Sequence, residues 1–171
     1  GTSFVPADLP NSNLVAVAAT DADDRLWPDS NFGASSVDIA APGVSIVTTT
    51  LDSLGTYRTV SGTSFAAPHV AGAAALILSL QGKVPPAEMI DHLGRFGTGV
   101  ADLQSTTVHG TRLQVDRSVV ASLLEDVSGS IFVDDIVWLA IVDITKGCNP
   151  PANTRYCPER PVSRGEMAAF L

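Results

Sequence analysis

The stretch that decides the fold is Gly62-Thr-Ser-Phe-Ala-Ala-Pro-His-Val-Ala-Gly72, which directly follows the β-branched run 57–61. This order predicts a strand that ends in a glycine turn and leads into a helix with Ser64 at its first position. Apolar residues without a polar face continue over 64–80, which predicts a helix buried on all sides. The small residues 72–75 would let neighbouring strands approach its axis closely.

The position of Ser64 suits a nucleophile. A helix N-terminus offers unpaired N–H groups and the positive end of the helix dipole. An oxyanion that forms beside Ser64 would be stabilised there, with the Ser64 N–H as one donor. Gly62 lets the backbone turn without a side chain that blocks the approach of a substrate. The alternative is that Ser64 is an ordinary helix-capping serine.

The rest of the chain alternates between strand and helix patterns. We expect strands over 13–20, 37–41, 45–50 and 57–61, and helices over 64–80, 85–96 and 115–124. The helix over 85–96 begins with prolines and is amphipathic, which is typical of a surface helix. Strands that alternate with helices predict an α/β layered fold.

Composition excludes several classes of protein. Hydrophobic residues make up 45% of the 171 residues and charged residues 16%, which excludes a disordered chain. The net charge of -8, without a basic run, argues against nucleic acid as a partner. The longest apolar stretch, 65–80, contains Pro68 and His69 and is shorter than the roughly 20 residues of a membrane span, so we predict none. Because Gly1 opens the chain without Met or a signal peptide, we expect a processed protein or a fragment.

The segment around Ser64 resembles the nucleophile segment of subtilisin-like serine proteases, the subtilases. The resemblance extends as far as Ser122 and includes upstream the segments 14–21, 31–33 and 38–43. It implies an α/β fold over 1–125: a subtilisin-like three-layer domain with a parallel sheet, its N-terminal half missing. It also implies that Ser64 is the nucleophile of a serine endopeptidase that hydrolyses peptide bonds through an acyl-enzyme.

None of the three histidines stands where the general base of Ser64 is expected. His69 follows Ser64 by about 7.5 Å of helix rise and about 140° of rotation, so it cannot reach the hydroxyl. In the family, the histidine at this place is structural. His92 lies on the amphipathic helix and His109 in a loop, and no motif surrounds either one.

The other catalytic groups of subtilases lie on segments upstream of everything in this chain. These groups are the orienting Asp, the basic His and the Asn that supplies the second oxyanion donor. A serine without a nearby base is a poor nucleophile, so we predict no meaningful peptidase activity for this chain alone. The alternative is a wall-anchored, non-catalytic scaffold with a degenerate protease domain.

Two further features have functional and structural interpretations. Val5, Pro6 and Ala7 stand where subtilases place one wall of the primary specificity pocket, whereas the alternative is a turn fixed by Pro6. Asp21 follows a strand and could ligate a cation, as in some subtilases, or it is a solvated turn aspartate. We expect no cofactor for the chemistry and calcium only as a structural ion, with ligands that the sequence does not identify.

The C-terminal part, 131–171, resembles a partial S-layer homology (SLH) repeat. The matching features are Phe132-x-Asp, an aromatic-bearing first helix, Ile144-Thr-x-Gly and Val162-Ser-Arg-Gly-Glu-Met-Ala. The resemblance implies a small helical tail that binds cell-wall polysaccharide. We expect the polar segment 126–130 to link it to the protease domain.

Within this tail, Arg164 and Glu166 are the candidate glycan-binding residues. The planar guanidinium of Arg164 suits carboxylate or phosphate groups on an anionic glycan. The alternative is a capping box formed by Ser163 and Glu166 alone. Cys148 and Cys157 flank a proline-rich loop, and in an exported protein we expect them to form a disulfide, because two cysteines alone make a weak metal site. The expected location is extracellular and cell-wall associated, with proteins or peptides as substrates.

Overall fold

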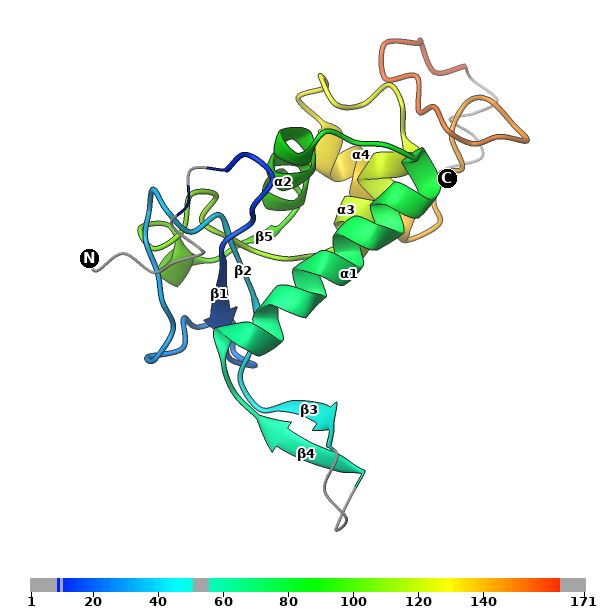
Figure 1. The fold of residues 1–171 in the computed structure, drawn as a ribbon. Helices are drawn as coiled ribbons and strands as arrows, with labels where there is room; N and C mark the ends of the chain where they lie inside the picture. The colour runs from blue at the N-terminus through cyan, green and yellow to red at the C-terminus, as the bar shows by residue number, and fades with distance from the viewer. Residues whose placement is uncertain (1–8, 10, 51–55, 164–171) are drawn as a thin grey trace. The chain divides into compact units, whose positions relative to one another are not determined.

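The computed structural model describes residues 9, 11–50 and 56–163 (Figure 1). The chain divides into two compact units, Gly1–Val115 and Asp116–Leu171. Among the described residues, the first unit contains a four-stranded sheet, a hairpin and helices of 19 and 10 residues. The described part of the second unit contains two helices of nine residues each and a loop closed by a disulfide.

The main sheet of the first unit is mixed. Its order is β1 (Val17–Thr20), β2 (Ile39–Pro42), β6 (Thr111–Arg112) and β5 (Thr98–Gly99). β1, β2 and β6 are parallel, but β5 runs antiparallel to β6. The prediction of a parallel sheet is therefore wrong at this edge. The connection 100–110, which includes the 3-10 helix η1 (Ala101–Leu103), is too short for the crossover that a parallel neighbour requires.

Small residues make up the centre of this sheet. Ala18 pairs with Ala40 and Ala19 with Ala41, and all four are buried. Because alanine side chains are short, helix α1 (Thr63–Gln81) packs directly on β1 and β2. Two of these alanines, Ala18 and Ala40, form a buried cluster with Ala16, Val37 and Leu103.

Helix α1 is buried along one stripe only. Its buried residues are Ala66, Val70, Ala73 and Ile77, which recur at helical spacing. Leu76 and Leu80 are each 51% exposed. The prediction of a helix buried on all sides is therefore wrong, because the described chain covers α1 from the side of the sheet. By length and composition alone α1 could cross a membrane, but core helices of globular domains meet the same criterion.

Two further elements of the first unit flank α1 in the sequence. β3 (Ile46–Thr49) and β4 (Tyr57–Val60) form an antiparallel hairpin apart from the main sheet, and it leads into the start of α1 (Figure 1). α2 (Pro86–Arg95) begins with proline as predicted, buries Met89 and Leu93, and contacts α1.

The second unit contains α3 (Val115–Leu123) and α4 (Val133–Ile141), joined by an ion pair between Arg117 and Asp134. The segment 126–130, where we expected a linker, packs within this unit. Val127 is 1% exposed, and the carboxylate of Asp126 accepts N–H bonds from two residues of the disulfide loop.

The disulfide loop is tied down at both ends. Cys148 and Cys157 are joined by a disulfide with their Cα atoms 6.1 Å apart. The Cys157 N–H donates to Asp126 at 2.8 Å, and the Cys148 N–H donates to the carbonyl of Arg155 at 2.7 Å. The loop therefore has a defined path in addition to its covalent closure.

Candidate active site

Ser64 is the second residue of α1, and its side chain is exposed. The N-cap is Gly62, with φ 157 and ψ 155, a backbone conformation that is open mainly to glycine. Because the N-cap residue is Gly62, and the described residues give it no side-chain cap bond, the interpretation of Ser64 as the N-cap serine is wrong. The N–H groups of Thr63 and Ser64 belong to the first turn, where the helix supplies no carbonyl partner.

Backbone hydrogen bonds hold this turn against the end of the sheet. The Gly62 N–H donates to the carbonyl of Gly43 at 2.8 Å, and the Gly43 N–H donates to the carbonyl of Thr20 at 3.0 Å. The Phe65 N–H donates to the carbonyl of Gly62 at 3.0 Å. The turn that carries Ser64 is thus connected to the last residue of β1. From the sequence, Gly43 is expected only to stop the strand over 37–41 together with Pro42.

Each histidine has a partner other than Ser64. The Nδ1 atom of His69 lies 2.8 Å from the carbonyl oxygen of Phe65, one turn back along α1. The ring of His92 packs against Phe96, with 4.8 Å between ring centroids. The ring of His109 lies beside Gly94 of α2, at the place that a Cβ atom there would occupy.

Carboxylates at the two ends of β1 bind the backbone, Asp21 after its last residue and Asp38 beside Ala16, which precedes its first. The Asp21 Oδ1 atom accepts hydrogen bonds from the N–H groups of Asp23 and Arg25, each at 2.9 Å. An aspartate that stabilises a turn makes such bonds to the backbone that follows it. The Asp38 Oδ2 atom accepts the N–H of Ala16 at 2.8 Å. Among residues 9, 11–50 and 56–163, no group of three or more His, Cys, Asp or Glu side chains could hold a metal ion.

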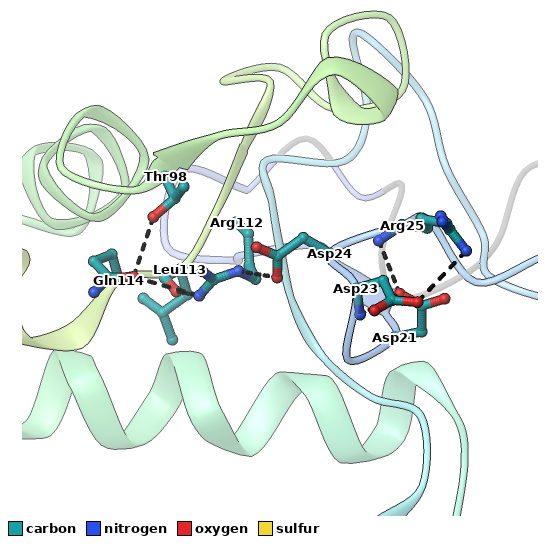
Figure 2. A network of polar contacts seen from close by, with 8 residues as sticks. All are labelled: Asp21, Asp23, Asp24, Arg25, Thr98, Arg112, Leu113 and Gln114. Atoms are coloured by element: carbon teal, nitrogen blue, oxygen red, sulfur yellow. Dashed lines mark hydrogen bonds and ion pairs between the residues drawn. The ribbon is translucent and has the colours of Figure 1, made fainter.

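Figure 2 shows a polar network that joins the loop after β1 to β6 and β5. The Asp24 carboxylate pairs with Arg112. Arg112 donates from Nη1 to the carbonyl of Leu113 at 2.8 Å and to Gln114 Oε1 at 3.4 Å. The Thr98 hydroxyl donates to the same Gln114 oxygen at 3.1 Å. This network gives the acidic loop a structural role that its sequence did not reveal.

Several predicted site residues fall outside the described residues. They are Val5, Pro6 and Ala7 of the predicted specificity pocket, and Arg164 and Glu166 of the predicted glycan site. The second unit has a cavity of about 240 Å³. Its lining consists of Thr145, Gly147, Cys148, Tyr156, Cys157, Pro158, Arg160 and Val162.

Comparison with known proteins defines the class. Residues 3–120 match the model of the subtilase family, Peptidase_S8. The chain therefore belongs to the subtilase family. Its mixed α/β fold is similar to that of a cold adapted subtilisin-like serine proteinase, with a TM-score of 0.53 and 36% identity. That similarity covers 61% of this chain and 38% of the other.

Two curated relatives give the same result. The chain is 50% identical over 78 residues to the thermophilic serine proteinase of Bacillus sp. (strain AK1), which covers 46% of this chain and 18% of that protein. It is 39% identical over 102 residues to subtilisin Savinase of Lederbergia lenta, which covers 60% and 36% respectively. The chain thus spans well under half the length of either relative.

These findings confirm the subtilase resemblance of the chain. They do not test the predictions made for the C-terminal tail, the domain limits and the calcium ion. The family match ends at residue 120. The SLH resemblance of 131–171 and the domain limits 1–125 and 126–130 therefore remain predictions, as does the structural calcium ion.

Proposed function

We propose that the first unit is part of the catalytic domain of a serine endopeptidase, in which Ser64 is the nucleophile. The observation that carries this proposal is the turn at Gly62, which presents an exposed serine hydroxyl beside the N-terminus of a long helix. The Ser64 oxygen attacks the scissile carbonyl while its proton passes to the basic His of the complete domain, which then gives that proton to the leaving amine; the oxyanion formed accepts a hydrogen bond from the Ser64 N–H. Release of the amine leaves an acyl-enzyme, which water then hydrolyses.

A second part of the proposal is that this chain is inactive alone. Each histidine of the chain has a partner other than Ser64, and a serine hydroxyl without an adjacent base is a weak nucleophile. The rest of the catalytic domain would supply the orienting Asp, the basic His and the Asn donor. In support, α1 exposes an apolar stripe, and among the described residues β1 forms its ladder with β2 alone.

We also propose that the substrates are proteins or peptides and that the protein acts outside the cell, with no nucleic acid partner. The disulfide between Cys148 and Cys157 supports this location, because disulfides persist in oxidising compartments. The tail is proposed to bind cell-wall polysaccharide. Its support is α4, the aromatic-bearing helix that the SLH resemblance requires, on which Trp138 is 57% exposed.

Labelling with a fluorophosphonate probe tests the nucleophile. In the full-length gene product we expect labelling that Ser64→Ala abolishes. Ser79→Ala is the matched control, because Ser79 is an exposed serine on the same helix whose hydroxyl bonds to the carbonyl of Leu76. Labelling that survives Ser64→Ala would refute the assignment.

The same probe distinguishes the proposed peptidase from the alternative hypothesis, a non-catalytic scaffold. We expect no labelling of the 171-residue chain alone, and rapid labelling of the full-length protein. A folded full-length protein that never reacts, and whose upstream sequence lacks the Asp or His, would be the non-catalytic scaffold instead.

A further inference from the structure

Gly43 lies where the main chain passes between β1 and the start of α1. A Cβ atom at this position would be 2.6 Å from the Cβ of Ala19, 2.9 Å from the carbonyl oxygen of Gly62 and 3.2 Å from the Cβ of Ala66. Real Cβ atoms essentially never approach other atoms closer than 3.0 Å. The φ angle of Gly43 is outside the left-handed region, so space, and not backbone conformation, excludes a side chain here.

The crowded position is also a link in a chain of hydrogen bonds. The Gly43 N–H donates to Thr20, and the Gly43 carbonyl accepts the N–H of Gly62. The Gly62 carbonyl in turn accepts the N–H of Phe65, within the first turn of α1. A displacement of Gly43 would therefore move the turn that carries Ser64, because Gly43 both contacts Gly62 and accepts its N–H hydrogen bond.

We propose that Gly43 is a positioning residue for Ser64. Its missing side chain sets how closely the Gly62 turn approaches the end of the sheet, and hence where the Ser64 hydroxyl and N–H lie. This inference rests on the proposed function. Any larger residue at 43 must push away the Gly62 carbonyl, since neither that group nor the alanine Cβ atoms can rotate aside. A misplacement of about 1 Å costs an enzyme about 100-fold in rate.

The chain offers two glycines as matched controls for Gly43→Ala. At Gly97 a Cβ atom would be 2.8 Å from the carbonyl oxygen of Arg112 and 2.8 Å from the Cβ of Thr111, so the crowding is similar but lies at β6. At Gly72, on the same helix as Ser64, a Cβ atom would meet nothing within 4 Å.

The first experiment measures kcat, KM, Tm and the rate of fluorophosphonate acylation for these variants of the full-length protein. For Gly43→Ala we expect kcat and the acylation rate to fall about 10- to 100-fold, with KM changed less than about threefold. For Gly97→Ala we expect a lower Tm with kcat within about twofold of the parent. Gly72→Ala is compared in the 171-residue chain, where a Cβ atom at 72 meets nothing within 4 Å; there we expect a Tm equal to or above that of the parent chain, because alanine favours a helix over glycine. A Gly43→Ala enzyme with parental kcat, or an equal loss in Gly97→Ala, would overturn the proposal.

A second variant separates the two contacts shorter than 3.0 Å that Gly43→Ala creates. Adding Ala19→Gly removes the nearest Cβ contact but leaves the contact with the Gly62 carbonyl. We expect the double variant to recover part of the Tm while kcat remains low. Full recovery of kcat would show that the Ala19 contact causes the defect, and would contradict positioning through Gly62.

A third measurement does not depend on activity. Amide chemical shifts of the 171-residue chain should change at Gly62, Thr63 and Ser64 in Gly43→Ala, and should stay unchanged there in Gly97→Ala. Unchanged shifts at these three amides would overturn the placement of Gly43. If the full-length protein never acylates, the proposed function fails, and the amide shifts still decide whether Gly43 controls this turn.

Discussion

Replacement of Ile77 by alanine tests the one-sided packing of α1. Ile77 is 1% exposed and lies on the buried stripe that faces the sheet, whereas its neighbour Leu76 is 51% exposed. Ile77→Ala removes about three buried carbons at about 0.8 kcal/mol each, and the cavity left behind adds to this loss. We therefore expect the free energy of unfolding to fall by about 3 kcal/mol. Leu76→Ala should change it by less than about 0.5 kcal/mol, because alanine also favours the helix.

Urea unfolding of the 171-residue chain measures both values. Trp27 reports on the first unit, because its backbone N–H donates to the carbonyl of Ala19 in β1 at 2.9 Å. A Trp138→Phe background removes the tryptophan of the second unit, whose side chain is 57% exposed. A loss of about 3 kcal/mol in Leu76→Ala would show that the outer stripe of α1 is covered in solution, and would refute the packing inferred here.

Three other predictions concern polar and covalent links. Asp126→Asn should lower the free energy of unfolding of the second unit by about 2 kcal/mol, because it weakens two charge-assisted bonds to backbone N–H groups. The loss is measured by Trp138 fluorescence during thermal unfolding. Arg112→Lys should lower the urea midpoint of the first unit almost as much as Arg112→Ala, because a lysine cannot reproduce the guanidinium contacts; a midpoint like that of the parent would contradict this role. Thiol titration of the 171-residue chain, secreted by its host and then denatured, should find no free thiol before reduction and two after it, from Cys148 and Cys157, whereas two before reduction would exclude the disulfide.

The local features of this protein are determined by its sequence alone. The strand, glycine turn and helix around Ser64 depend on neighbouring residues, and the helix predicted over 64–80 is observed as Thr63–Gln81. The subtilase family follows from the same stretch, because its residues are contiguous. The predicted helix over 85–96 also contains the observed Pro86–Arg95, because proline marks its start.

Other features depend on residues that are distant in the chain, and only the tertiary structure decided them. The antiparallel β5 follows from the length of the connection 100–110 and not from any residue of the strand itself. The exposure of Leu76 depends on which side of α1 the sheet covers. A helix segment that is apolar on all sides does not indicate which side that is. The need for glycine at 43 arises from Ala19 and Gly62, on separate elements, since steric exclusion acts between atoms brought together by folding.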